Sequence, residues 1–430
     1  MRKAIKKHPR RTIVIGFMGI ILIGTLLLML PISSESGQSV PFVDSLFTST
    51  SAVCVTGLVV VDPGDTFTVF GETVIALLIQ IGGLGITSIG VITILIASGK
   101  VSMGGRKLAK EAFNLATGKG LRDVILGVVY VTLAFELLGA ALSFITFIQD
   151  YALKDAVGIS FFHSIAAFNN AGFDIFGGFK NMADYRDDVW INLVTSMLII
   201  MGGIGFFVTR EMFAKRSFKQ LSLHSKVVIS MTGALIVVGT VLLKLSEGTT
   251  WLSAFFHSVS ARTAGFASEP MGDFSTVGVL IMVFLMFVGA SPGSTGGGIK
   301  TTTFFVILNN MRSVAFNRHC TAFRRKIPAG IVSKALVVAM LAMASIFIST
   351  TLLCIFEPGL ALEDVVFEVV SGFGTVGLSR GITPNLSTAS EIVLVFTMFI
   401  GRLGPLTIIT LWWNNAKPQA SYSEEELTVG

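Results

Sequence analysis

A glycine-centred tetrapeptide occurs four times in this chain, and this recurrence constrains the fold more than any other feature. The copies are Val55-Thr56-Gly57-Leu58, Asn170-Ala171-Gly172-Phe173, Thr263-Ala264-Gly265-Phe266 and Thr375-Val376-Gly377-Leu378. A phenylalanine precedes the four glycines by 10, 10, 9 and 10 residues, and successive glycines are 115, 93 and 112 residues apart. One such tetrapeptide carries no information, but four copies at a nearly constant offset indicate an internal repeat.

The composition is that of an integral membrane protein. Of the 430 residues, 52% are hydrophobic and 13% are charged, whereas soluble domains carry about 25% charged residues. Apolar runs that approach the roughly 20 residues needed to cross a bilayer lie near 12–30, 72–97, 124–148, 189–209, 227–245, 276–312, 331–356 and 390–413. The first run follows a basic N-terminus but lacks a small-residue cleavage site, so we interpret it as a retained span.

The glycine stretches fall between the first and second span of each successive pair. The half-apolar segments before them, such as 42–53 and 252–261, are too short to span and suit re-entrant helices. The fold class is therefore an all-α polytopic membrane protein built from four helix–pore loop–helix repeats. We place the repeats at 1–98, 99–215, 216–326 (with a broken second helix) and 327–414, followed by a C-terminal tail at 415–430.

Basic residues predict the orientation of the chain. Segments 1–11, 99–123, 210–226 and 312–326 hold 6, 6, 5 and 5 Lys or Arg, together 22 of the 32 in the chain. The positive-inside bias places these segments and both termini in the cytoplasm, and the glycine stretches are then approached from outside. The opposite loops are acidic, which is typical either of ordinary solvated loops or of a vestibule that concentrates cations.

Non-helical backbone at membrane depth must be buried by protein or line a water-filled cavity. Four glycine stretches around one axis would direct carbonyl oxygens at a common path, where these oxygens can replace the hydration shell of a cation. Glycine suits this role because it adopts positive φ without a Cβ penalty. The alternative is that the glycines are helix-packing positions, but four equivalent copies favour the pore.

The four glycine stretches and their neighbours resemble those of a known family. The stretches that begin at Ser51 (S-A-V-C-V-T-G-L), Phe168 (F-N-N-A-G-F), Arg262 (R-T-A-G-F) and Phe373 (F-G-T-V-G-L) look like the four selectivity filters of the Trk/Ktr/HKT potassium-transport superfamily, and the length is most similar to the Ktr membrane subunit. The resemblance implies a pseudo-fourfold pore in one chain of the cell membrane, with K⁺ as the substrate and Na⁺ commonly supporting uptake. It assigns the filter to Val55, Thr56, Gly57, Asn170, Ala171, Gly172, Thr263, Ala264, Gly265, Thr375, Val376 and Gly377. Since all four key positions are glycine, the resemblance also implies a preference for K⁺ over Na⁺.

The apolar run of the sixth span is interrupted by a segment that cannot stay helical, because proline lacks a donor and glycine loses the most backbone entropy. Broken helices in transporters usually line the pathway, and the resemblance matches this segment to an intramembrane loop that obstructs the pore. The predicted gate consists of Gly289, Ala290, Ser291, Pro292, Gly293, Ser294, Thr295, Gly296, Gly297, Gly298, Lys300 and Arg402. The segment also approaches the nucleotide P-loop pattern, but Ile299 breaks the spacing and no strand precedes it.

Charged residues within the spans are expensive in a bilayer and must face protein or water. We expect the Arg402 guanidinium to hold carbonyls of the loop in the closed state, although a purely structural role is the alternative. The glycines at 82–85 and 202–205 are interpreted as packing positions that make room for the loop. Arg262 is expected to anchor the third filter from behind, and Glu136 either snorkels or pairs.

Neither an enzyme nor a resident metal site is indicated, because no catalytic carboxylate pair lies within a span and the five histidines form no cluster. The competing function is a secondary carrier or membrane enzyme for an anionic solute, which would need basic groups facing a cavity at mid-membrane. Short loops leave no room for a nucleotide-binding domain, so regulation is expected from a separate chain. The resemblance implies a cytosolic ring of RCK-type nucleotide-binding subunits and a homodimer of the membrane subunit, to which the tail could contribute. No nucleic-acid partner is expected.

Overall fold

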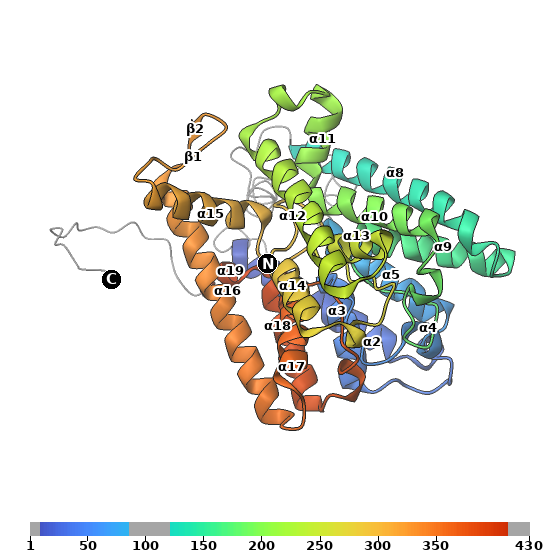
Figure 1. The fold of residues 1–430 in the computed structure, drawn as a ribbon. Coiled ribbons are helices and arrows are strands. Elements are labelled where there is room, and N and C mark those ends of the chain that lie inside the picture. Colours follow the sequence, from blue (N-terminus) through green and yellow to red (C-terminus); the bar gives the residue numbers. More distant parts are fainter. Residues whose placement is uncertain (1–8, 86–120, 412–430) are drawn as a thin grey trace.

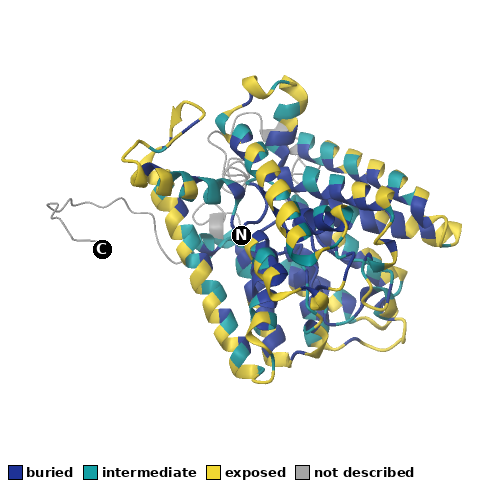
Figure 2. Cartoon of the chain, in the orientation of Figure 1, coloured by how far each residue is buried: buried dark blue, intermediate teal, exposed yellow. Residues whose placement is uncertain are grey.

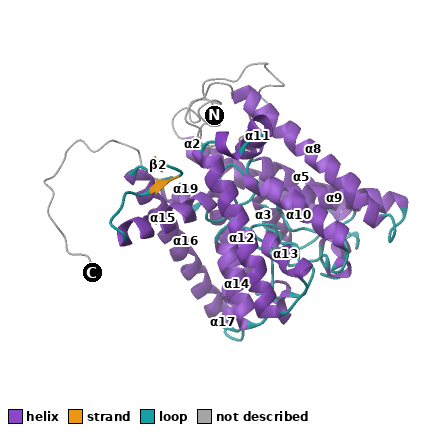
Figure 3. Cartoon of the chain, turned by 45° about the horizontal axis from the view of Figure 1, so that its top comes forward, coloured by secondary structure: helices purple, strands orange, loops and turns teal. Residues whose placement is uncertain are grey.

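The structure, a computed structural model, describes residues 9–85 and 121–411, and within these ranges the elements of secondary structure are helices joined by loops, apart from one short hairpin (Figures 1 and 3). The hairpin pairs strand β1 (Thr321–Ala322) with β2 (Arg325–Lys326) in an antiparallel manner. The all-α prediction for a membrane protein is therefore confirmed at this level. The C-terminal tail and most of the basic segment 99–123 lie outside the described residues.

The same order of elements occurs four times along the described chain. Each unit begins with a long helix, namely α2 (Pro9–Leu28), α8 (Leu121–Phe147), α12 (Leu223–Glu247) or α16 (Ala329–Phe356). A shorter helix follows and ends at the glycine stretch, namely α3 (Phe42–Cys54), α9 (Leu153–Phe168), α13 (Trp251–Ser260) or α17 (Leu362–Gly374). A further helix then leads away, namely α5 (Val69–Leu84), α10 (Val189–Ile204), α14 (Thr276–Phe287) or α18 (Thr388–Leu403). The remaining elements are α4 (Pro63–Thr66), α11 (Phe206–Lys215), α15 (Thr301–Ala315), α19 (Pro405–Ile409) and five 3-10 turns at Pro31–Ser33, Ala183–Tyr185, Phe218–Gln220, Met271–Asp273 and Thr383–Asn385.

Among the described helices, the four long ones are each long and apolar enough to cross a bilayer. Their outward faces carry exposed apolar side chains, as on α16, where Phe347 and Met340 are 72% and 65% exposed. Figure 2 shows the contrast between these exposed faces and the buried short helices between them. This distribution suits a protein whose outer surface faces lipid, because lipid tails do not penalise exposed apolar groups.

A polar side chain fixes the start of each second helix. Thr68, Asp188, Ser275 and Ser387 occupy the N-cap positions of α5, α10, α14 and α18, and each side chain accepts a hydrogen bond from a backbone amide of the first turn. Such caps satisfy amides that have no partner within the helix. The second helix thus begins with the same kind of cap in all four repeats.

Each second helix ends at a break in the chain. The sequence predicted only the break after α14, at 289–298. Gly85, Gly205 and Gly404 follow α5, α10 and α18 with positive φ values of 78°, 100° and 84°. At Gly205 the chain bends by 100° between α10 and α11. The apolar runs predicted as spans near 189–209 and 390–413 are therefore not single helices in their described parts, because a glycine with positive φ cannot continue a right-handed helix.

Small residues bring the short helices close to the long ones. In the first three repeats, a methyl group on Gly24, Gly139 or Gly239 would overlap the hydroxyl of Ser49, Ser164 or Ser258. Each of these hydroxyls donates to a backbone carbonyl of the long helix. The accepting residue lies three positions before the glycine, and the distances are 2.7, 2.7 and 2.9 Å. The short helices are therefore held at a fixed depth within the fold.

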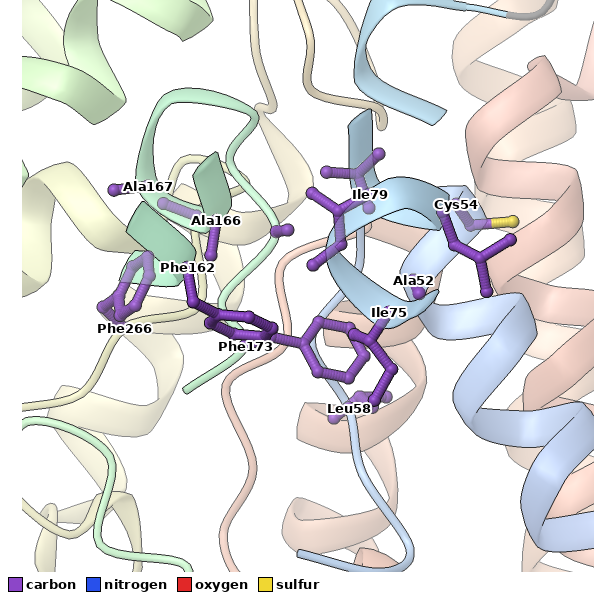
Figure 4. Packing of buried hydrophobic residues seen from close by; sticks show 14 of the residues in the cluster. Ala52, Cys54, Leu58, Ile75, Ile79, Phe162, Ala166, Ala167, Phe173 and Phe266 are labelled. Atoms are coloured by element: carbon purple, nitrogen blue, oxygen red, sulfur yellow. The ribbon is translucent and has the colours of Figure 1, made fainter. Parts of the chain in front are cut away.

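Aromatic and aliphatic side chains fill the space around the glycine stretches. Figure 4 shows Phe162, Phe173 and Phe266 packed together, with Leu58 and Ile75 nearby. Phe173, Phe266 and Leu58, which directly follow three of the glycines, are at most 1% exposed. These side chains anchor the end of each stretch in the core.

Candidate ion pathway

The sequence repeat is also a repeat of backbone conformation. Two residues before each glycine, Val55, Asn170, Thr263 and Thr375 adopt left-handed φ values of 58°, 59°, 73° and 50°. The glycines Gly57, Gly172, Gly265 and Gly377 have φ values of 95°, 69°, 78° and 97°. Residues other than glycine rarely adopt positive φ. Four non-glycine residues with the same unusual geometry therefore show that the stretches are built to one plan.

Hydrogen bonds to the preceding helix hold each stretch. Thr56, Ala171 and Val376 donate their backbone amides to the carbonyl of the residue six positions before the glycine, at 2.8, 2.8 and 2.9 Å. In the third repeat, Ala264 donates at 2.9 Å to Ser260, which lies only five positions before the glycine. This tighter turn accounts for the offset of 9 between Phe256 and Gly265.

The four stretches contact one another in a closed cycle. A methyl group on Gly57 would lie 3.0 Å from the Cα of Gly172, and one on Gly172 would lie 3.0 Å from that of Gly265. The corresponding distances are 3.1 Å from Gly265 to Gly377 and 2.9 Å from Gly377 to Gly57. Each methyl group would also overlap the carbonyl oxygen of the residue before the next glycine. The stretches thus form a ring of backbone in which no side chain fits at the glycine positions.

A second set of glycines packs behind the ring. Methyl groups on Gly82, Gly202 and Gly401 would overlap the backbone carbonyls of Val53, Phe168 and Phe373. These glycines belong to α5, α10 and α18, which therefore contact the backbone of the stretches directly. The interpretation that the glycines at 82–85 and 202–205 mainly make room for the loop is corrected here. Among the glycines at 202–205, Gly205 does make room for the loop, because a methyl group there would lie 2.8 Å from the Pro292 carbonyl.

The interrupted segment 289–298 lies against the ring. The Gly297 amide donates to the Thr375 hydroxyl at 2.9 Å, and a methyl group on Gly296 would overlap the Thr263 hydroxyl. The Ser291 amide donates to the Gly203 carbonyl at 3.0 Å. A parallel bridge between Val288 and Ile299 closes the base of the loop. The loop thus contacts the residues that precede two of the ring glycines and the end of α10.

Two basic side chains hold this loop. Lys300 donates to the carbonyls of Gly296 and Gly297 at 2.7 and 3.2 Å. The Arg402 guanidinium donates to the Thr295 carbonyl in the loop and to the Gly82 carbonyl at the end of α5. The expected contact between Arg402 and a loop carbonyl is therefore present. Because Lys300 is engaged by its own loop, the structure gives no support to the P-loop reading.

The structure also reveals polar contacts that the sequence did not predict. The Asn181 amide donates to the Gly172 carbonyl at 3.4 Å and to the Asp174 carboxylate at 3.0 Å, while its oxygen accepts from the Ala267 amide at 3.0 Å. Asn181 therefore connects the second and third stretches just beyond their glycines. Burial, reinforced by the negative charge of Asp62, raises the pKa of Asp174 in this loop to about 7.

Arg262 occupies the position expected of a rear anchor. It is 2% exposed and donates to the Thr232 carbonyl of α12 at 3.1 Å. Glu136 does not snorkel to the surface but pairs with Gln80 and Asn169. The residues of that network lie 33 and 56 positions apart from Glu136 in the chain, so only the folded structure brings them together.

Comparisons with known proteins agree with this architecture. The model of a family described as "TrkH: Cation transport protein" matches residues 6–235 and 227–424. The chain is 38% identical to Ktr system potassium uptake protein B of Bacillus subtilis, with 100% of this chain and 98% of that protein covered. It is 35% identical to the potassium/sodium uptake protein NtpJ of Enterococcus hirae, with coverage of 100% and 99%. The Ktr system potassium uptake protein B of Vibrio alginolyticus is also 35% identical, with coverage of 100% and 96%.

The fold is shared with a solved transporter. The crystal structure of the potassium transporter TrkH from Vibrio parahaemolyticus matches with a TM-score of 0.71 over 93% of this chain and 86% of that chain. Sequence identity in this match is 18%, so it bears on the fold alone.

Proposed function

The chain belongs to the TrkH family of cation transport proteins, and on this premise we propose that it takes up K⁺ across the cell membrane through a filter formed by its four glycine stretches. As a member of this family it is a multi-pass membrane transporter and not an enzyme. The observation that carries the proposal is the closed cycle of contacts from Gly57 through Gly172 and Gly265 to Gly377.

In the proposed filter, each repeat contributes three consecutive residues to a pseudo-fourfold pore. These are Val55, Thr56 and Gly57; Asn170, Ala171 and Gly172; Thr263, Ala264 and Gly265; and Thr375, Val376 and Gly377. Their backbone carbonyls would replace the hydration shell of a K⁺ ion. The names of the relatives support K⁺ as the substrate, and one of them includes Na⁺, which we propose as a supporting ion.

In the proposed gate, the loop at 289–298 closes the path next to the filter. Its contacts with Thr263 and Thr375 support this role, because they place the loop against the residues that lead into the filter glycines. Lys300 stiffens the loop from within, and Arg402 ties it to the end of α5. Opening would then require these hydrogen bonds to break.

The remaining assignments follow from the same premise. The repeats occupy 1–98, 99–215, 216–326 and 327–414, and both termini are cytoplasmic, as the distribution of 22 basic residues supports. A cytosolic ring of RCK-type subunits controls the gate, and two membrane subunits form a homodimer. The proposal of a partner is supported by relatives named as proteins of a Ktr system.

Uptake of K⁺ or ⁸⁶Rb⁺ into liposomes tests the filter and the gate together. Wild type is compared with Gly265→Ser and with a deletion of 289–298. The proposal expects selective K⁺ flux that loses selectivity in Gly265→Ser, because the new side chain would meet the Val376 carbonyl and Gly377. The deletion is expected to raise flux. Flux indifferent to both changes would assign the glycines to packing and favour the anion carrier.

A further inference from the structure

Three polar side chains meet behind the second filter strand, one from α5, one from α8 and one from the residue that directly follows α9. The Asn169 amide nitrogen lies 2.9 Å from Oε1 of Glu136 and 2.9 Å from Oε1 of Gln80, and it donates to both. Gln80 in turn donates through Nε2 to Oε2 of Glu136 at 3.2 Å. Glu136 is 6% exposed and Asn169 is fully buried. We refer to Gln80, Glu136 and Asn169 as the buried triad.

The triad joins the first repeat, which supplies Gln80, to the second, which supplies Glu136 and Asn169. At the positions equivalent to Glu136, three residues before the packing glycine of the long helix, the first and third repeats have Ile21 and Ile236. The positions equivalent to Gln80, twelve residues after the N-cap of the second helix, are Ile200, Phe287 and Phe399. Polar residues thus replace apolar ones at two positions that meet in space, and burying them is costly unless each is hydrogen-bonded.

The third position lies three residues before the filter glycine. Here the second repeat has Asn169 and the third has Arg262, and each side chain hydrogen-bonds to the long helix of its own repeat. The first and fourth repeats have Cys54 and Gly374 at this position, and within residues 9–85 and 121–411 neither makes a side-chain hydrogen bond to a long helix. The second and third filter strands are therefore anchored from behind in a way that the first and fourth are not.

The chemistry of the triad requires one carboxylate. Asn169 presents the same nitrogen to both partners, so both must offer an oxygen, and Gln80 must also donate to its neighbour. An ionised carboxylate has two acceptor oxygens, whereas an amide has one oxygen and one NH₂ group. With amides at all three positions, the Asn169 atom that faces both partners requires the same kind of atom from each. The other two amide atoms, which face each other, are then either both NH₂ groups or both oxygens, however the amides are turned.

We infer that Glu136 and Gln80 are positioning residues that hold the second filter strand through Asn169 and thereby set its ion selectivity. The inference rests on the proposed function of the strand as a filter. Asn169 directly precedes Asn170, whose left-handed φ of 59° begins the filter segment. A displaced Asn169 therefore moves the carbonyls that would discriminate between K⁺ and Na⁺, since selectivity depends on the field and number of coordinating carbonyls.

The test compares K⁺ and Na⁺ uptake in liposomes for four proteins. They are wild type, Glu136→Gln, the double exchange Gln80→Glu with Glu136→Gln, and Glu391→Gln as a matched control. Glu391 is a carboxyl of similar burial, 8% exposed, that has no hydrogen bond to a filter residue among the described contacts. The double exchange restores every donor and acceptor with the carboxylate on the other helix.

The expected result is a K⁺/Na⁺ uptake ratio that falls by about fivefold or more in Glu136→Gln, which leaves one buried polar group unsatisfied, and that returns in the double exchange. Glu391→Gln should keep the wild-type ratio. An unchanged ratio in Glu136→Gln overturns the inference, as does a folded double exchange that stays unselective. If Glu136→Gln cannot be recovered, the double exchange alone decides. A wild type without K⁺ preference would instead refute the proposed function.

Discussion

Replacing Arg402 by alanine should open the proposed gate. The guanidinium donates to the Thr295 carbonyl of the loop and to the Gly82 carbonyl of α5, and so bridges the loop and the end of that helix. A hydrogen bond from a charged donor contributes about 1.5–3 kcal/mol. Removing both therefore destabilises the closed arrangement by about 3–6 kcal/mol, if neither bond persists when the loop moves.

This energy corresponds to a large shift in population. Since about 1.4 kcal/mol is a factor of ten in an equilibrium constant, the ratio of open to closed protein should rise by at least about 100-fold. The assay is ⁸⁶Rb⁺ flux into liposomes that contain the membrane subunit alone, with flux normalised to reconstituted protein. Flux should rise strongly in Arg402→Ala, until opening no longer limits it.

Arg402→Lys separates geometry from charge. A lysine keeps the positive charge, but its compact ammonium lacks the planar fork that reaches two carbonyls from two sides. We therefore expect flux between that of wild type and that of Arg402→Ala. Equal flux in wild type and both variants would refute the reasoning, and equal flux in wild type and Arg402→Lys alone would show that charge, and not the bridge, closes the loop.

Two further predictions concern stability. Gly401→Ala should destabilise the protein by about 1–3 kcal/mol, because the new methyl group overlaps the Phe373 carbonyl and backbone cannot move aside easily. In the control variant Gly233→Ala the methyl group meets nothing within 4 Å, so the thermal midpoint should rise slightly. Equal midpoints for the two variants would contradict this prediction. Hydrogen bonds from Ser387 and Ser390 lower the pKa of Glu357, so its contribution is present above the usual carboxyl range and is lost as pH falls through the lowered value. The midpoints of wild type and Glu357→Gln should differ at neutral pH and converge in acid, and a constant difference would exclude the linkage.

Local sequence patterns were sufficient to predict the short helices and the glycine stretches. Segment 42–53 was expected where α3 spans Phe42–Cys54, and 252–261 where α13 spans Trp251–Ser260. These predictions succeeded because hydrophobic length and glycine position are properties of neighbouring residues. The breaks after α10 and α18 were missed, since hydropathy does not register a reversal of φ at Gly205 or Gly404.

The buried triad and the Asn181 contacts could not be predicted in the same way. Gln80, Glu136 and Asn169 come from α5, from α8 and from the residue after α9, and Asn181 joins residues that precede and follow it by 9 and 86 positions. Nothing in the local sequence of a single polar residue within an apolar run distinguishes a network from an isolated group. One signal was available, namely that Glu136 replaces the isoleucine found at the equivalent positions of two other repeats.

The closed ring of contacts among the four stretches has a consequence for biosynthesis. Gly377 closes the ring on Gly57, yet it is synthesised 320 residues later. At about 5–20 residues per second, the first stretch would wait roughly 15 to 60 seconds for its last neighbour. During that interval its carbonyls need shelter from lipid, which the insertion machinery or the partly assembled earlier repeats must provide. A chain released before the fourth repeat would carry an open arc of polar backbone, so quality control of nascent chains has a clear feature to recognise.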